Sequence, residues 1–254
     1  MNKPVKAIVL AAGRGTRLRT EGCDLPKVMR SANGTPLLRH VLSALDFLPQ
    51  EDIVIVVGYK KELIYEAFPN FAFAEQAEQR GTGHAVMAAS RLLPDFEGDL
   101  LVCCGDMPLI RRETYEALLR AHRDGGAPCT ILSGTASLPL PYGRILRDAA
   151  GSFSRIVEDR DCSETEREAE ELNSGVYIFD AAALRSVLGR LSCGNTQGEY
   201  YLTDAPGLLL SDGCTVDICR RELGMEIIGV NTPEQLDTVS RILRETGRET
   251  EGHV

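Results

Sequence analysis

Short apolar runs alternate with longer amphipathic segments along the first half of the chain. The apolar runs at Val5–Leu10, Ile53–Val57, 71–74 and 100–104 have the length and composition of buried strands. The segments at 37–48, 61–67, 83–93 and 111–123 are longer and predict helices. Strict alternation of strand and helix predicts an α/β fold with a mostly parallel sheet that helices cover on both faces.

The second half of the chain is less regular. Apolar runs at 130–133, 175–179, 215–219 and 226–230 predict further strands, and a β excursion is expected around 142–157. A last helix is predicted after Thr232, because Thr232-Pro233-Glu234-Gln235 combines an N-cap, a proline at the first helical position and a glutamine at N3. Since the sequence has no internal repeat or low-complexity linker, residues 1–254 are predicted to form one domain.

Composition narrows the class of protein. The 254 residues carry a formal net charge of −9, which argues against a general nucleic-acid binder. No apolar run approaches the roughly 18 residues of a membrane-spanning helix, so no membrane partner is expected. The eight cysteines form no Cys-x-x-Cys pair and the four histidines are scattered, so no zinc site is predicted. Buried free thiols, as expected at Cys103 and Cys104, favour a reducing, cytoplasmic setting.

The segment after the first strand, Ala11-Ala12-Gly13-Arg14-Gly15-Thr16-Arg17, has the composition of an anion-binding loop. Glycines let backbone N–H groups turn toward a ligand, and Thr16, Arg17 and Lys27 add a hydroxyl and two cations. The dinucleotide fingerprint requires a third glycine where Leu18 stands, and no Walker A motif occurs. The loop therefore predicts a bound polyphosphate, with an ordinary strand-to-helix turn as the alternative.

Two polar residues follow other predicted strands and are candidate metal ligands. Asp106 comes after the apolar run 100–104, and Asn231 after 226–230. Because ligands bind at the carboxyl ends of strands in α/β sheets, their oxygens are well placed for Mg²⁺. The alternatives are that Asp106 caps the turn before Pro108 and that Asn231 caps the last helix, although Thr232 already serves as that cap.

Gln76, after another predicted strand, is a candidate for base recognition. Its carboxamide offers both a donor and an acceptor, as recognition of a pyrimidine edge requires. The alternative is a solvent-exposed glutamine in a loop. His84 is interpreted as a packing residue at the start of a helix rather than as a catalytic group.

Several further motifs occur in a fixed order, and together they resemble one family. The chain resembles the pyrophosphorylase half of bacterial bifunctional N-acetylglucosamine-1-phosphate uridylyltransferase over nearly its whole length. The motifs lie at 10–17, 25–28, 76–85, 105–106, 142–145, 156–159, 173–175, 197–204 and 229–231. The resemblance implies a Rossmann-like three-layer nucleotide-diphospho-sugar transferase fold with a mostly parallel central sheet and a smaller β-containing sugar-binding part. It places nucleotide binding at about 1–110, sugar-phosphate binding at about 111–231, and a C-terminal helix and tail at 232–254.

The resemblance also implies a reaction and a set of site residues. UTP and N-acetylglucosamine 1-phosphate would give UDP-N-acetylglucosamine and pyrophosphate, with Mg²⁺ as cofactor. Arg17 and Lys27 are the implied catalytic residues, and Asp106 and Asn231 the implied metal ligands. The implied triphosphate contacts are Leu10, Ala11, Ala12, Gly13, Gly15 and Thr16, and the implied uracil contacts are Gln76, Gly81 and Thr82. The implied sugar-phosphate contacts are Gly143, Glu158, Asn173 and Thr203, with Glu199 and Tyr201 lining the same side.

The chain departs from the family pattern at three points. The loop at 18–23, beside the expected triphosphate, is longer than usual, and Cys104 stands where relatives often carry an aromatic or small residue. The acetyltransferase half does not occur in these residues, so we expect a sugar phosphate that is already acetylated, or a different one. The trimer built by that half is not expected, which leaves a monomer or a dimer.

Other functions stay open at this stage. A nucleotidylyltransferase for another nucleotide and another sugar or alditol phosphate would need the same Arg17, Lys27, Asp106 and Asn231. A non-catalytic sugar-nucleotide sensor is a second alternative, although such a protein would not need Lys27 and the metal ligands. A glycosyltransferase of related fold is disfavoured, because Gly105-Asp106-Met107 lacks the expected Asp-x-Asp pair.

Overall fold

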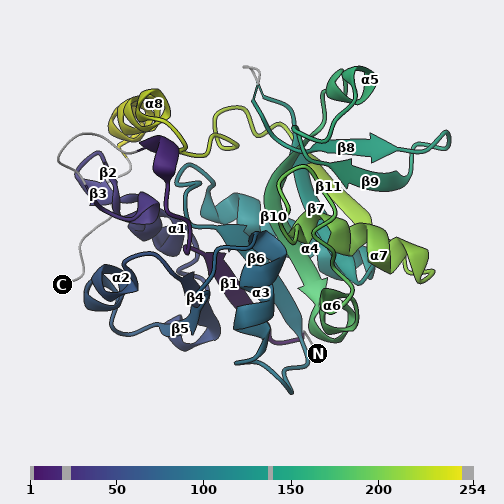
Figure 1. Cartoon of the computed structure of the whole chain (residues 1–254), viewed down its shortest axis with the longest axis horizontal. Coiled ribbons are helices and arrows are strands. Elements are labelled where there is room, and N and C mark those ends of the chain that lie inside the picture. Colours follow the sequence, from purple (N-terminus) through teal and green to yellow (C-terminus); the bar gives the residue numbers. More distant parts are fainter. Residues whose placement is uncertain (1–2, 19–23, 137–139, 248–254) are drawn as a thin grey trace.

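A twisted sheet forms the centre of the molecule (Figure 1). The computed structural model describes residues 3–18, 24–136 and 140–247. The main path of the sheet has the strand order β11-β7-β10-β6-β1-β4-β5. Along this path β10 runs antiparallel to both of its neighbours and the other pairs are parallel, so the mostly parallel sheet is confirmed. The strands are β1 (Val5–Leu10), β4 (Ile53–Val57), β5 (Ala72–Glu75), β6 (Asp99–Cys104), β7 (Cys129–Gly134), β10 (Leu172–Asp180) and β11 (Asp217–Arg221).

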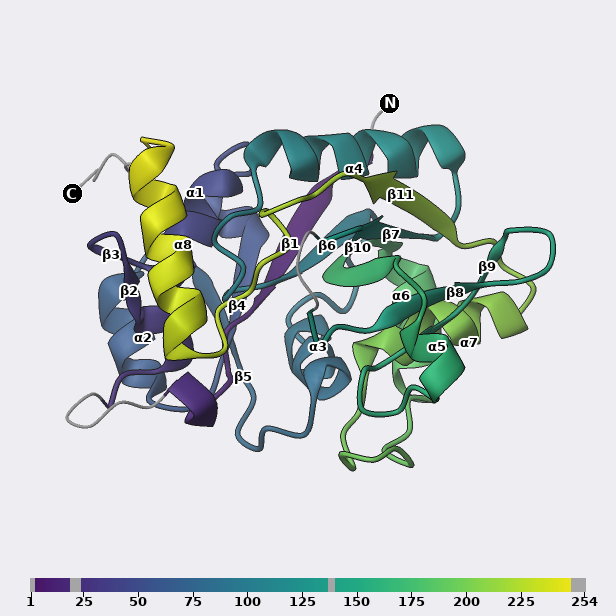
Figure 2. The same ribbon diagram turned by 90° about the horizontal axis from the view of Figure 1, so that it is seen from above.

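Two antiparallel hairpins extend this sheet or stand beside it. Strands β8 (Arg144–Arg147) and β9 (Phe153–Val157) pair with each other, and β8 joins β10 through Leu172 and Arg144. This hairpin is the β excursion expected around 142–157. The second hairpin, β2 (Ser31–Ala32) and β3 (Thr35–Pro36), lies beside the last helix, α8 (Pro233–Glu245), in both views (Figures 1 and 2).

Helices cover both faces of the sheet, which gives the expected three layers (Figure 2). One face packs against α1 (Leu37–Ala44), α2 (Lys61–Ala67) and α4 (Arg112–Gly125). The other face packs against α3 (Thr82–Ser90), α6 (Ala181–Leu188) and α7 (Ala205–Ser211). Alternation along β1 explains the two layers, because Ala7 and Val9 are buried on the first face and Ile8 on the second.

The shorter helices lie outside these layers or within loops. They are α5 (Glu164–Arg167) and the 3₁₀ turns Thr16–Leu18, Lys27–Met29, Gln50–Asp52 and Leu202–Asp204. Helix α8 buries Val239 and Leu243 in a separate apolar cluster that also contains Leu18 and Leu37. The predicted cap of α8 is confirmed, since Gln235 N donates to Thr232 Oγ1 (3.3 Å) and Thr232 N donates to Gln235 Oε1 (3.1 Å).

Some predicted elements differ from the structure in their bounds, and one predicted strand does not form. Helix α1 ends at Ala44 rather than at 48, although Phe47 and Leu48 still pack against the core. No strand forms at 226–230. That segment is a turn in which Glu226 N donates to Leu223 O (2.8 Å), and its apolar side chains are buried without pairing to the sheet. The run is apolar because its side chains are buried. Periodicity alone does not distinguish a buried irregular segment from a buried strand.

Within the described residues, no helix combines the length and the apolar character needed to cross a membrane. The division of the chain near residues 110 and 231 stays a prediction.

Candidate functional site

The glycine loop after β1 packs closely against the segment that carries Lys27. Gly15 has a left-handed backbone with φ of +61°, and a Cβ built there would approach Lys27 Cβ to 2.6 Å. A side chain at position 15 would therefore displace the lysine. Gly13, in contrast, has open space around its Cα, which leaves the backbone beside it accessible to a ligand.

Lys27 is the centre of a cluster of four predicted site residues. Its ammonium forms an ion pair with the Asp106 carboxylate and donates to Asn231 Oδ1 (2.8 Å). Arg17 Nη2 donates to the same amide oxygen (3.2 Å). The Lys27 and Asp106 side chains are only 15% and 19% exposed, so this charge pair is partly shielded from water. Residues widely separated in the chain thus meet at one point, and their roles in catalysis and metal binding stay predictions.

Two backbone hydrogen bonds hold the segments that place Asp106 and Asn231 beside Lys27. Gly105 N donates to Leu10 O (2.9 Å), which holds the end of β6 beside the end of β1, and Val230 N donates to Asp106 O (2.9 Å). Asn231 N donates to Gln235 Oε1 (2.7 Å) in the first turn of α8. Asn231 therefore does not stand at a strand end, as the sequence suggested, but in a segment tied between β6 and α8.

The donor set fits a magnesium ion that binds together with a polyphosphate. One carboxylate and one amide oxygen converge on the Lys27 ammonium, so both oxygens face a single cationic position. Mg²⁺ is usually held by one or two carboxylates together with waters and substrate phosphates. Among the described residues, no group of three or more His, Cys, Asp or Glu side chains could hold a metal ion. The residues present therefore suit a metal whose remaining ligands come from substrate and water.

A cavity of about 250 Å³ contains the predicted base-binding residues. Gln76 lines it and is only 4% exposed, which excludes a solvent-exposed loop residue. Its Nε2 donates to Gly81 O (2.9 Å) and lies 3.2 Å from His84 Nδ1. His84 thus contacts Gln76 at the start of α3, beyond the packing role expected for it. We call this space the nucleotide-side cavity; Lys27, Gly13 and Thr82 also line it.

The start of α3 is docked against the segment before the 3₁₀ turn at 202–204. Gly81 has φ of +102°, and a Cβ there would lie 2.5 Å from Tyr200 O, so only glycine fits without displacement. Leu202 N donates to Thr82 Oγ1 (3.0 Å). These contacts join the predicted nucleotide part to the predicted sugar part.

A second cavity of about 180 Å³ adjoins the first, and we call it the sugar-side cavity. Four of the predicted sugar-phosphate residues line it: Gly143, Glu158, Asn173 and Thr203. The two cavities share the wall residues Leu10, Thr82, Cys104 and Asp106. They therefore form one cleft, with Asp106 at the junction.

The sugar-side cavity contains a partly buried acid, Glu158, and a buried amide, Asn173, both held by hydrogen bonds. Burial raises the pKa of the Glu158 carboxyl, and a bond from Thr203 Oγ1 (3.0 Å) opposes the rise. Asn173 Nδ2 donates to Tyr177 Oη (2.7 Å), while Asn173 N donates to Gly143 O (2.8 Å). The wall is thus preorganised with groups able to bind hydroxyl and amide groups of a ligand.

Not every predicted residue lies where it was expected. Glu199 lines the nucleotide-side cavity rather than the sugar-side cavity. Tyr201 lines neither; it is buried, and its hydroxyl accepts from Gln197 Nε2 (2.8 Å). Most of the long loop at 18–23 lies outside the described residues. The binding roles of all these residues stay predictions.

Among the cleft residues that received no role from the sequence, Cys104 and Tyr142 have the most informative positions. Cys104 was expected to be a buried thiol, as Cys103 is, but it is only partly buried and lines both cavities. Its place at the end of β6 and the alternation of side chains along a strand were the available signal. Tyr142 lines the sugar-side cavity, and its hydroxyl accepts from Gly229 N (2.7 Å). It stands inside one of the motifs, but nothing local in the sequence indicates its distant partner.

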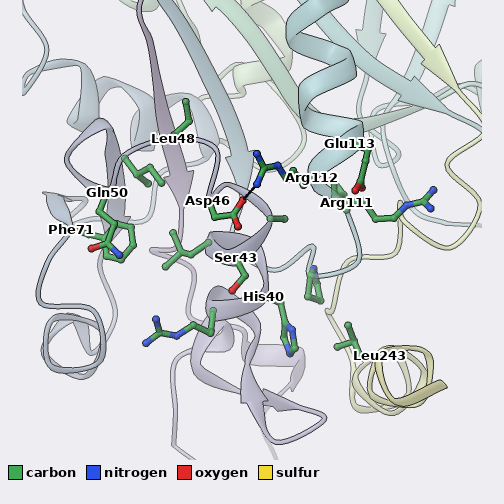
Figure 3. Close-up of a pocket in the computed structure, with 16 residues that line it drawn as sticks. His40, Ser43, Asp46, Leu48, Gln50, Phe71, Arg111, Arg112, Glu113 and Leu243 are labelled. Atoms are coloured by element: carbon green, nitrogen blue, oxygen red, sulfur yellow. Dashed lines mark hydrogen bonds and ion pairs between the residues drawn. The ribbon is translucent and has the colours of Figure 1, made fainter. Parts of the chain in front are cut away.

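A larger cavity of about 640 Å³ lies between α1, the start of α4 and Leu243 of α8 (Figure 3). It shares no lining residue with the cleft and contains none of the predicted site residues. Three arginines line it: Arg112 pairs with Asp46 (2.7 Å), Arg111 pairs with Glu226 (2.7 Å from Nε), and Arg39 Nη2 donates to Ala67 O (3.3 Å). We call it the rear cavity. Its size exceeds that of the cleft, but the converging charged groups of the predicted chemistry are in the cleft.

Comparison with known proteins identifies the family to which this chain is similar. The model of the MobA-like NTP transferase domain matches residues 7–168. Similar curated relatives include the bifunctional protein GlmU of Bacillus cereus, of Bacillus thuringiensis and of Bacillus anthracis. Each is 41% identical to this chain over 239 residues, which are 94% of the chain and 51% of the relative. The chain therefore spans about half the length of these relatives.

Proposed function

The chain belongs to the MobA-like NTP transferase domain family, and on that premise we propose a specific nucleotidyl transfer. The proposed substrates are UTP and N-acetylglucosamine 1-phosphate, and the products are UDP-N-acetylglucosamine and pyrophosphate. Mg²⁺ is the proposed cofactor. The likeness to GlmU proteins over 94% of the chain supports this choice of substrates.

One observation carries the proposal. The Lys27 ammonium, paired with Asp106 and Asn231, stands where the nucleotide-side and sugar-side cavities meet. A transfer between two bound phosphates requires charge neutralisation at the boundary between their binding sites. The cleft provides a cation and a candidate metal position at that boundary.

The proposed reaction is a direct displacement at phosphorus. An oxygen of the sugar phosphate forms a bond to the α-phosphorus of UTP, and the bond from that phosphorus to the bridging oxygen of the β-phosphate breaks. Pyrophosphate leaves with the electron pair, and the anomeric C–O bond of the sugar is untouched. Because no protein nucleophile is needed, positioning and charge stabilisation are the main contributions of the residues.

The residues of the cluster divide these contributions. Lys27 acts as a point charge on the α-phosphate, and Arg17 binds the departing pyrophosphate through its planar guanidinium. The Lys27 ammonium must first leave its ion pair with Asp106 and move to the phosphate, because Asp106 neutralises it before substrate binds. Bound through Asp106 and Asn231, Mg²⁺ would withdraw charge from the phosphate oxygens. The amides around Gly13 and Gly15 would hold the remaining phosphates.

Substrate choice is assigned to the walls of the two cavities. Gln76, with Gly81 and Thr82, would bind the uracil edge, because its buried carboxamide is held by backbone and ring contacts on the cavity wall. Glu158 and Asn173 would bind the hydroxyl and acetamido groups of the sugar. Another pair of nucleotide and sugar phosphate would leave the same cluster in use and change only these contacts.

The test is pyrophosphate release by the purified chain with UTP, Mg²⁺ and N-acetylglucosamine 1-phosphate. Glucosamine 1-phosphate, glucose 1-phosphate and the other nucleoside triphosphates serve as comparison substrates. Rapid release confined to UTP with the acetylated sugar supports the proposal, and Asp106→Ala should abolish it. Activity with a different pair overturns the proposed substrates. If no substrate pair gives pyrophosphate release and the chain still binds a sugar nucleotide, the proposed catalysis is overturned in favour of a non-catalytic sensor.

A further inference from the structure

Tyr142 connects the wall of the sugar-side cavity to the segment that carries Asn231. Its side chain lines that cavity, and its hydroxyl oxygen accepts the N–H of Gly229 (2.7 Å). The two residues are 87 positions apart in the chain. This bond therefore joins the start of the β8–β9 hairpin to the turn that precedes α8.

The contact with Gly229 is close and bears directly on the position of Asn231. A Cβ built on Gly229 would lie 3.0 Å from Tyr142 Oη and 3.4 Å from Met107 Cγ. The next residue, Val230, donates to Asp106 O (2.9 Å), and Asn231 follows with its side chain on Lys27. Two consecutive backbone N–H groups are thus held just before the residue that contacts Lys27. Loss of either bond would loosen the segment carrying Asn231.

The hydroxyl proton of Tyr142 is available to a ligand. A phenol is both donor and acceptor, and within the described part of the chain the Tyr142 hydroxyl has one hydrogen-bond partner, the N–H of Gly229, which it accepts. Burial raises the pKa of Tyr142, so the proton stays on the oxygen at neutral pH. Since the residue lines the sugar-side cavity, a bound molecule is the natural acceptor of that proton.

We propose that Tyr142 is a positioning residue that couples occupancy of the sugar-side cavity to the position of Asn231. Its proton is donated to an oxygen of the bound sugar phosphate, while its oxygen retains the N–H of Gly229. Hydrogen bonds in such a chain polarise one another, so each strengthens when the other forms. The acceptor substrate thereby helps to fix the Asn231 contact to Lys27. This inference rests on the proposed function and adds a residue that acts on both substrates.

The test compares Tyr142→Phe with the wild type and with Tyr65→Phe. The first variant removes only the hydroxyl, and we expect about a tenfold loss of affinity for N-acetylglucosamine 1-phosphate, measured by calorimetry. Pyrophosphate release should show a lower kcat and a higher KM for the sugar phosphate, with the KM for UTP unchanged. Tyr65 packs edge-to-face on Phe73 (4.7 Å between centroids) away from the cleft, so Tyr65→Phe should match the wild type.

A double-mutant cycle with Gly229→Ala separates positioning from simple contact. If Tyr142 acts through Gly229, the two changes share one interaction, and their combined effect on kcat should be smaller than the product of the single effects. Additive effects, or equal losses of affinity for both substrates, overturn the coupling. An active wild type with an unaffected Tyr142→Phe variant overturns this inference alone. A wild type that neither binds sugar phosphate nor releases pyrophosphate overturns the proposed function and this inference with it.

Discussion

The two cavities of the cleft are built in different ways. On the nucleotide side, Gln76 is held by Gly81 and His84, which lie five and eight positions away in the chain. On the sugar side, Glu158 is held by Thr203 over 45 positions, and Tyr142 contacts Gly229 over 87. The side chain of Gln76 is thus held by contacts that are local in the chain, whereas the sugar-side contacts join segments that are far apart in the chain.

The charges of the two cavities differ as well. The nucleotide-side cavity is lined by the Lys27 ammonium and a glycine loop, which suits phosphates. The sugar-side cavity contains the partly buried Glu158 carboxyl, which suits hydroxyl groups and disfavours a second polyphosphate. We expect this difference in charge to help separate the two proposed substrates, although Glu199 also lines the nucleotide-side cavity. Variants in each cavity test this separation.

The largest effect is expected where the cavities meet. Lys27→Ala removes the cation between them and leaves Asp106 without its ion-pair partner. We expect pyrophosphate release to fall about 10²- to 10³-fold, because one preorganised charge on the reacting phosphate is lost. Steady-state kinetics measure this. Lys61→Ala, which removes a lysine paired with Glu75 outside the cleft, should retain normal rates. Near-normal turnover of Lys27→Ala would remove its proposed role.

The next effect is confined to the nucleotide-side cavity. Gln76→Ala removes the carboxamide, and we expect the preference for UTP over CTP to fall about tenfold, since one donor and acceptor pair distinguishes the two bases. Competition kinetics with both nucleotides measure the ratio. The KM for the sugar phosphate should stay unchanged and serves as the internal control. An unaltered nucleotide preference would assign base reading to other groups, such as the backbone at Gly81.

A smaller effect concerns the sugar-side cavity and pH. The ordinary pKa of Glu158 is 4.5, and burial raises it in the folded protein. Between these two values the folded state holds more protons than the unfolded state, so the free energy of unfolding falls as the pH rises. Glu158→Gln removes this decrease. Denaturant unfolding at several pH values should therefore show the variant gaining stability relative to the wild type as the pH rises above 4.5.

Glu166→Gln provides a control of opposite sign for the pH experiment. Hydrogen bonds from Ser163, together with Arg155, lower the pKa of the Glu166 carboxyl to about 2. Its stabilising contribution is present above 4.5 and is lost as the pH falls toward 2. The wild type should therefore lose its advantage over Glu166→Gln on acidification. Parallel curves for the two variants would contradict the raised pKa of Glu158.

The smallest effect is expected at the rear cavity. Arg112 is 46% exposed and pairs with Asp46 and Glu116. Exposed ion pairs stabilise proteins weakly, so Arg112→Ala should change the free energy of unfolding by less than about 1 kcal/mol. Denaturant unfolding and pyrophosphate release measure the two quantities. A substantial loss of turnover would show that the rear cavity acts on the cleft.

Much of the fold was predictable because its strands are short and buried. The bounds of β1, β4 and α2 agree with the sequence patterns, since apolar composition and length there admit one interpretation. The strand expected at 226–230 was wrong because burial of Ile227 and Val230 comes from packing rather than from pairing in the sheet. Tertiary context decides such runs, and no local pattern contains it.

The candidate site was predictable to a different degree in each cavity. The glycine loop and Asp106 follow from residue types at strand ends. The meeting of Lys27 with Asn231 was implied by resemblance alone, because the two are 204 positions apart. The Tyr142 contact with Gly229 could not be inferred, since neither residue type indicates a partner. Local chemistry in the sequence therefore identified the residues, whereas only the folded chain shows which of them meet.

The position of Asn231 late in the chain has a consequence for synthesis. The ribosome releases Lys27 and Asp106 first, and their ion pair forms once β1 and β6 are paired. Asn231 and α8 are synthesised well after Asp106, so the nascent chain passes through a stage in which Lys27 and Asp106 can pair while Asn231 has yet to join them. The cluster of Arg17, Lys27, Asp106 and Asn231 is therefore complete only after α8 has docked, because Asn231 N donates to Gln235 in its first turn.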